Sequence, residues 1–201
     1  MQLVGRLLSP FVRRVAATLN LYGMPFEALP LSTVTDGAAI AAINPLGRVP
    51  ALILDDGEVL VDSAAILDHL DERAGPSALI PNSGPTRRRV LNAVALGLGA
   101  AEKSVAAYYE TARRPEAWRW PEGAEAMMAQ ARGGFAALEA MATGEYLLPS
   151  GLTQADVTAV VALDFARKVL PDMVEGRFPK LDALSLCLNA DPRVGSTQFA
   201  G

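Results

Sequence analysis

Apolar and polar positions in the first thirty residues follow a pattern that predicts a strand, a helix and a second strand. Residues 2–7 form a short apolar run, and the apolar positions after Pro10 then repeat with helical period as far as Gly23. Proline suits the first position of a helix, and glycine suits the position just beyond its end. Residues 26–31 complete a unit whose length predicts parallel pairing with a right-handed crossover. The polar residues expected on the other side of this helix are Arg13, Arg14 and Asn20.

The next part of the pattern predicts a short helix, a hairpin and a further helix. The short helix covers residues 37–43. Two apolar runs, over 51–54 and 58–61, flank Asp55-Asp56-Gly57, which is typical of a hairpin turn. Ser63 is expected to be the N-cap of the helix that follows, because a stripe of apolar positions with helical spacing begins directly behind it. The resulting order, βαβαββα, is the thioredoxin-like arrangement.

The second half of the chain is predicted to be helical. It is rich in alanine and leucine and has few β-branched runs, and long helical patterns cover residues 86–113 and 122–143. Thr153 and Asp156 are spaced to form a reciprocal capping box at the start of another helix. A stretch rich in proline and glycine separates the two halves and indicates a linker. The expected domains are 1–75 (α/β), 76–85 (linker) and 86–201 (all-α).

Composition and charge narrow the range of functions. The chain of 201 residues has a net charge of −4, without the basic excess that a nucleic-acid interface requires. It contains no uninterrupted apolar run long enough to span a membrane and no signal-peptide layout, so we expect no membrane association and a cytoplasmic location. Cys187 is the only cysteine and His69 the only histidine, which argues against a disulfide and against a His-rich metal site. The apolar neighbours of Cys187 predict a buried, inert thiol.

The stretch from Asn44 to Ser63 is the most informative part of the sequence. It runs Asn-Pro-Leu-Gly-Arg-Val-Pro-Ala-Leu, continues through the hairpin, and ends in Asp-Ser at a helix start. This resembles the hallmark of the glutathione S-transferase family. The segment Ser-Pro-Phe-Val that begins at Ser9 is similar to the serine-type members, theta- or tau-like in pattern, and the chain has the length of bacterial members. The alternative is a generic hairpin and helix in a small α/β protein.

The resemblance implies a glutathione transferase fold, with a thioredoxin-like domain followed by an all-helical one, and glutathione as co-substrate without a metal. Ser9 would hold and polarise the glutathione thiolate. A free thiol with a pKa near 8.5 is only about 3% ionised at neutral pH, and lowering that pKa by about two units requires ~2.7 kcal/mol. One hydrogen bond to a charged acceptor supplies ~1.5–3 kcal/mol, and a helix N-terminus adds ~0.3–2 kcal/mol. A single hydroxyl is therefore sufficient, although Ser9 is also explained as a helix N-cap alone.

The other glutathione contacts are assigned by the same resemblance. The backbone of Val49 would pair with the tripeptide like an added strand, next to a cis bond to Pro50. Asp62 would bind the α-amino group of the γ-glutamyl end, and Ser63 its carboxylate, at a helix N-terminus. Arg48 stands where the family often has Lys or Gln near the glycyl carboxylate. The alternatives are a capped helix with an exposed acid at Asp62 and a solvated side chain at Arg48.

The acceptor site is less well defined. Its candidates are Phe11, Tyr108 and Tyr109, but adjacent residues on a helix face different directions, so at most one tyrosine is expected to line the site, and packing is the alternative for each. The implied reaction is addition or substitution by glutathione thiolate on a small, apolar electrophile, as in detoxification. Isomerisation, dehalogenation or peroxide reduction at the same site remain alternatives, as does a non-catalytic glutathione- or ligand-binding protein. The resemblance also implies a homodimer.

Overall fold

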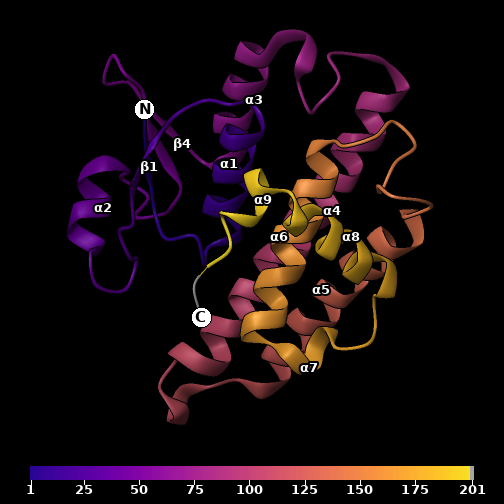
Figure 1. Cartoon of the computed structure of the whole chain (residues 1–201). Coiled ribbons are helices and arrows are strands. Elements are labelled where there is room, and N and C mark those ends of the chain that lie inside the picture. The colour runs from indigo at the N-terminus through magenta and orange to yellow at the C-terminus, as the bar shows by residue number, and fades with distance from the viewer. Residues whose placement is uncertain (200–201) are drawn as a thin grey trace. The chain divides into compact units, whose positions relative to one another are not determined.

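The computed structural model describes residues 1–199, and they divide into two compact units (Figure 1). The first unit comprises Met1–Leu79 and the segment that begins at Asn189, and the second comprises Ile80–Leu188. The division after Leu79 falls within the stretch expected to be a linker. The segment from Asn189 groups with the first unit, whereas the sequence analysis assigned it to the helical domain, because it packs against the first helix of the chain.

The first unit has the predicted order of strands and helices, and its thioredoxin-like fold is confirmed. Its strands form one four-stranded sheet in the order β2-β1-β3-β4. The pair β1 and β2 is parallel, and the other two pairs are antiparallel. Every strand has only three residues, so the strands are shorter than the apolar runs suggested. The elements of this unit are β1 (Gln2–Val4), α1 (Pro10–Leu21), β2 (Glu27–Leu29), α2 (Gly37–Ile43), β3 (Ala51–Ile53), β4 (Val59–Val61), α3 (Ser63–Ala74), a 3₁₀ turn (Gly75–Ser77) and α9 (Pro192–Gly195).

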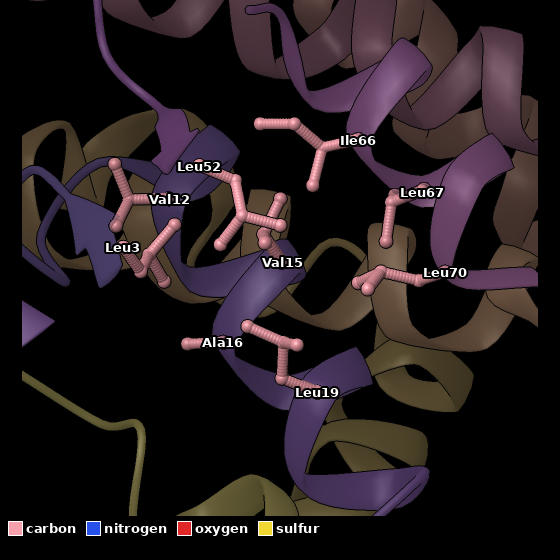
Figure 2. Packing of buried hydrophobic residues seen from close by; sticks show 9 residues of the cluster. All are labelled: Leu3, Val12, Val15, Ala16, Leu19, Leu52, Ile66, Leu67 and Leu70. Carbon is pink, nitrogen blue, oxygen red and sulfur yellow. The ribbon is translucent and has the colours of Figure 1, made fainter. Parts of the chain in front are cut away.

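A core of aliphatic side chains joins α1 and α3 to the sheet (Figure 2). Each of these side chains is at most 1% exposed. Burial of one such side chain contributes about 1.5–3 kcal/mol relative to leaving it in water. The starts of α1 and α3 are therefore held at fixed positions beside the sheet. The residues of the core are Leu3, Val12, Val15, Ala16, Leu19, Leu52, Ile66, Leu67 and Leu70.

Two arginines of α1 are buried, so the amphipathic pattern predicted for this helix was wrong at these positions. Arg13 and Arg14 were expected on the polar side, but they are only 1% and 2% exposed. The guanidinium group of Arg13 donates to Asn189 Oδ1 at 2.6 Å and to Thr197 Oγ1 at 3.3 Å. The C-terminal segment therefore covers this face of α1. The periodicity of one helix cannot reveal that a segment so distant in the sequence packs on it.

The second unit is all-helical, as predicted. The long helix α4 packs on both α5 and α6. Its last residue is followed by a single π-helical turn that ends at the break before Pro115, where the sequence analysis ended the first long helical pattern. The elements of this unit are α4 (Gly84–Tyr108), the π turn (Tyr109–Arg113), a 3₁₀ turn (Glu116–Trp118), α5 (Pro121–Met141), α6 (Gln154–Val169), α7 (Pro171–Val174) and α8 (Pro179–Ala190).

The capping box predicted at the start of α6 is present. The hydroxyl of Thr153 accepts from the backbone, and Asp156 Oδ2 accepts the backbone N–H of Thr153 at 2.8 Å. The other carboxylate oxygen of Asp156 accepts the N–H of Leu147 at 2.7 Å, so this side chain also fixes the connection between α5 and α6. Burial raises the pKa of Asp156, and these donors oppose that shift.

Cys187 corrects another expectation, because its thiol is exposed. On α8 the buried side chains include Leu184 and Leu188, four residues apart, at 4% and 5% exposure. Leu186 and Cys187 lie on the opposite side, and Leu186 is 76% exposed. Apolar neighbours in the sequence therefore did not indicate burial.

One helical segment qualifies the expectation of no membrane association. Within the described residues, Gly84–Arg113 is long and apolar enough to cross a membrane, with a mean hydropathy of 1.2 over its best window. The sequence has no uninterrupted apolar run of that length, but this window includes a few charged residues. The indication is weak, because 44% of the window is buried inside the protein and the core helix of a soluble protein passes the same test.

Candidate functional site

The predicted glutathione-binding segments meet at one edge of the sheet. β1 pairs with β3, and β3 pairs with β4, in a register that places Gly5, Pro50 and Asp62 in one row just beyond the last paired residues. Where neighbouring strands end in the same row, the loops that follow or precede them lie close together. The chain segments that leave this row carry the other predicted site residues of this unit, which are Ser9, Val49 and Ser63.

Ser9 is the N-cap of α1. Its backbone is extended, and its Oγ accepts the N–H of Val12 at 3.4 Å, a long and therefore weak hydrogen bond. Pro10 occupies the first helical position, where its missing N–H has no consequence. The Ser9 side chain is half-buried, and no acceptor for its hydroxyl proton occurs within residues 1–199. The capping role is thus present, and the hydroxyl proton stays available to a ligand at the positive end of the helix.

The loop before β3 presents Val49. The bond between Val49 and Pro50 is cis, as the resemblance implied. Asn44, which is 1% exposed, fixes the preceding turn: its side-chain amide donates to the carbonyl of Arg48 at 2.8 Å and accepts from the backbone. Among residues 1–199 the backbone of Val49 has no hydrogen-bond partner, so its N–H and C=O can pair with an extended peptide. The side chain of Arg48 is exposed.

The start of α3 differs from the prediction by one residue. Asp62 rather than Ser63 is the N-cap, and its Oδ1 accepts the N–H of Ala64 at 3.1 Å. Asp and Ser are about equally good caps, so the sequence could not decide between them. Asp62 has a φ of +67°, and within the described residues it is the only residue other than glycine with a positive φ. Such a backbone is costly and tends to persist at ligand sites. Ser63 takes the first helical position and is 2% exposed.

Arg14 is a charged group near this site that the sequence analysis missed. It is fully buried, and its Nε and Nη1 have no hydrogen-bond partner within the described part of the chain. Burial lowers the pKa of Arg14 to about 10, and the carboxylates of Asp62 and Asp71 oppose that shift. The cation adds positive potential beside the start of α3, where a helix already favours anions. Nothing in the sequence marks a buried arginine, because arginine counts as polar in any periodicity.

The candidate acceptor residues belong to different units. Phe11 is half-buried in the first turn of α1. Tyr108 and Tyr109 lie in the second unit, where Tyr108 packs edge-on against Phe165 with ring centroids 6.3 Å apart, and Arg113 lies 5.5 Å from the centroid of its ring. Tyr109 is 45% exposed, and its ring meets that of Tyr108 edge-on with centroids 6.1 Å apart. Neither their role nor that of Phe11 is tested by these contacts, and the acceptor site stays a prediction.

The described residues contain no cluster of side chains that could bind a metal ion. Within residues 1–199 no group of three or more His, Cys, Asp or Glu side chains is placed to hold a metal ion. Near the start of α3, the buried cation of Arg14 interacts with the carboxylates of Asp62 and Asp71.

Known proteins share this architecture and sequence motif. Residues 3–78 match a family model described as the N-terminal domain of glutathione S-transferase. A glutathione transferase family member from Pseudomonas fluorescens Pf-5, solved with bound glutathione, is 33% identical, with a TM-score of 0.90 over 100% of this chain and 99% of that chain.

Two curated relatives match over a shorter length. Maleylacetoacetate isomerase of Pseudomonas aeruginosa is 42% identical over 91 residues, which is 43% of this chain and 42% of that protein. The uncharacterized GST-like protein YibF of Escherichia coli is 32% identical over 113 residues, 56% of each chain. This chain thus spans about half the length of the curated relatives that it matches.

The matched family model covers the unit that holds Ser9, Val49 and Asp62, and the Pseudomonas fluorescens structure aligns with both units from end to end. Fold, site motif and overall similarity agree, and this chain belongs to the glutathione S-transferase family.

Proposed function

We propose that this protein binds glutathione at the sheet edge near the starts of α1 and α3 and transfers its thiolate to small, apolar electrophiles. The observation that carries the proposal is the row formed by Gly5, Pro50 and Asp62. The chain segments around this row carry the hydroxyl of Ser9 with its available proton, the unpaired backbone of Val49, and the start of α3 next to the cation of Arg14. These are complementary to a thiolate, a peptide and a carboxylate, which are the groups of glutathione. The structure of the Pseudomonas fluorescens relative with bound glutathione supports the same ligand.

Ser9 stabilises the thiolate in this proposal. Its Oγ already caps α1, so it lies where the N-terminal partial charge of the helix favours an anion. One hydrogen bond to the thiolate, at ~1.5–3 kcal/mol, together with the helix contribution, accounts for a thiol pKa about two units below that of free glutathione. No general base is required, because solvent takes the proton.

The remaining residues bind and orient the tripeptide. The backbone of Val49 pairs with the cysteinyl residue as an added strand. The hydroxyl and backbone amide of Ser63 bind the γ-glutamyl carboxylate at the start of α3, and Asp62 accepts from the α-amino group. Arg48, exposed in the loop before β3, pairs with the glycyl carboxylate. Phe11, in the first turn of α1, contacts the apolar acceptor.

A glutathione-dependent isomerase is the second candidate, and the similarity to a maleylacetoacetate isomerase favours it. In such a reaction the thiolate adds to a carbon–carbon double bond, the resulting single bond rotates, and the thiolate leaves as the double bond re-forms. The thiolate is regenerated, so the same residues serve both reactions. The two are distinguished by the product, since isomerisation of maleylacetoacetate consumes no glutathione and conjugation consumes one molecule per turnover.

A homodimer and a cytoplasmic location complete the proposal. Both are inferred from the family, and the dimer is checked by size-exclusion chromatography with light scattering. A mass of about twice 21.2 kDa supports it, and a mass near 21.2 kDa contradicts it.

The experiment that tests the mechanism is the ultraviolet absorbance of the glutathione thiolate across pH, in the presence of the wild type and of Ser9→Ala. We expect a bound thiol pKa about two units below 8.5 in the wild type and a return towards the free value in Ser9→Ala. Ser83→Ala is the matched control, because Ser83 is also the N-cap of a helix, in the second unit, and its side chain makes no capping hydrogen bond. Binding without a thiolate signal would leave a non-catalytic glutathione-binding protein.

A further inference from the structure

Gly5 lies at the end of β1 in a position that leaves no room for a side chain. It follows β1, is buried, and donates its N–H to the carbonyl of Leu29 at 2.9 Å. Its φ is +124°, which side chains rarely tolerate. A Cβ added there would lie 2.5 Å from Val12 Cγ2 and 2.9 Å from Val49 Cβ. Real Cβ atoms essentially never approach other heavy atoms within 3.0 Å. The segments that carry Val12 and Val49 therefore both pack directly against this glycine.

Both segments carry groups assigned to glutathione. Val12 lies in the first turn of α1, and its N–H is the one that Ser9 Oγ accepts. Val49 supplies the backbone proposed to pair with the cysteinyl residue, immediately before Pro50. Val12 is fully buried in the core and cannot move outward without disturbing it. The missing side chain of Gly5 thus sets how closely the backbone of Val49 approaches the turn that holds Ser9.

We propose that Gly5 is a positioning residue for glutathione, and that the close approach of Val12 and Val49 to Gly5 fixes the separation between the thiolate-binding hydroxyl and the peptide-binding backbone. The inference rests on the proposed function. The cysteinyl residue must reach Ser9 with its sulfur and Val49 with its backbone at the same time. A methyl group at position 5 displaces one of the two segments by a few tenths of an ångström or more, so the ligand cannot keep both contacts at their best geometry.

Other glycines of the same unit separate this effect from backbone strain. Gly23 ends α1 with a φ of +64° and Gly57 lies in the hairpin with a φ of +90°, and no atom lies within 4 Å of a Cβ added at either position. Alanine at either site must also adopt a positive φ, but it touches nothing. The cost in φ is larger at Gly5, because +124° lies outside the left-handed region that L residues occupy, so the variants are compared by affinity and bound thiol pKa and not by stability. Gly23→Ala is the closer control, because it lies at the other end of the helix that Ser9 begins.

The test compares Gly5→Ala with Gly23→Ala in the full-length chain, by calorimetric titration with glutathione and by the pKa of the bound thiol. We expect the dissociation constant of Gly5→Ala to rise about tenfold and its bound thiol pKa to move towards the free value. Gly23→Ala should keep both within about twofold of the wild type, although both variants lose thermal stability. A role of Gly5 in stability alone would lower the melting temperature and leave the thiol pKa of the bound fraction unchanged.

A double variant keeps the test informative if Gly5→Ala does not fold. In Gly5→Ala/Val12→Ala the contact at 2.5 Å is gone, while the contact with Val49 Cβ at 2.9 Å remains. We expect it to bind glutathione about tenfold more weakly than Val12→Ala alone. Equal affinities in that pair, or equal effects of Gly5→Ala and Gly23→Ala, would overturn the inference and leave the proposed function intact. A wild type that binds no glutathione would overturn both.

Discussion

Replacing Asp156 by alanine tests how the second unit is held together. This carboxylate, at 0% exposure, accepts the N–H of Leu147 at 2.7 Å and both the N–H and the hydroxyl of Thr153, at 2.8 and 2.9 Å. In the variant the two amides are left in an interior site without partners. Each such loss costs ~1–3 kcal/mol, and relief of the buried charge offsets part of it, so we expect a loss of ~2–4 kcal/mol in the free energy of unfolding.

The assay is urea unfolding followed by circular dichroism. With a slope of about 2–3 kcal/mol per molar urea, the expected loss moves the midpoint down by roughly 0.7–2 M. Asp191→Ala is the matched control: Asp191 caps α9 through the N–H of Arg193 at 2.9 Å, but at the surface, and its removal should cost about 0.5–1 kcal/mol. Equal losses in the two variants would refute the claim that burial makes the Asp156 network the stronger one.

Two further predictions concern the first unit. Arg13→Met should lower the free energy of unfolding by ~2–4 kcal/mol, because it breaks hydrogen bonds to the C-terminal segment. Arg14→Met should be near neutral or stabilising, since two nitrogens of that buried guanidinium lack hydrogen-bond partners within the described residues. Thermal unfolding that ranks the two variants the other way would contradict this. Tyr22→Phe removes a hydroxyl that donates to Asp71 and accepts the N–H of Leu79 at 2.7 Å, at a cost of ~1–3 kcal/mol. Burial and the Asp71 hydrogen bond raise the pKa of Tyr22, so the folded state keeps a proton that the unfolded state releases near pH 10. The free energy of unfolding of the wild type should therefore fall above about pH 10, and its difference from that of Tyr22→Phe, measured by urea unfolding, should narrow. A difference that stays constant with pH would contradict a raised pKa of Tyr22 in the folded state.

Features that depend on neighbouring residues were predictable from the sequence. The order of strands and helices follows from the spacing of apolar positions and from Pro10, Gly23 and the hairpin glycine Gly57. The capping box of Thr153 and Asp156 is likewise a local pattern, and it is present. The motif between Asn44 and Ser63 indicated the family and the cis bond before Pro50. Local patterns succeed here because turns, caps and helix periods are set by interactions within a few residues.

Features that depend on distant segments were not predictable. Arg13 is buried because the C-terminal segment returns to α1, and Arg14 because α1 packs against α3. Cys187 is exposed because its helix turns other residues inward. The constraint on Gly5 arises where α1 and the Val49 loop close over it, and no spacing in the sequence marks that contact. The choice of Asp62 over Ser63 as the N-cap of α3 was decided by the backbone, not by residue preference.

A calorimetric titration of the wild type and of Ser63→Ala with glutathione tests directly whether the glutathione site lies at the start of α3. We expect a saturable heat with one glutathione per chain in the wild type. The dissociation constant should be at least about tenfold higher in Ser63→Ala, because a buried hydroxyl and its proposed contact with the γ-glutamyl carboxylate are lost. Absence of binding to the wild type, or equal affinity in the variant, would contradict the placement of the glutathione site at the start of α3.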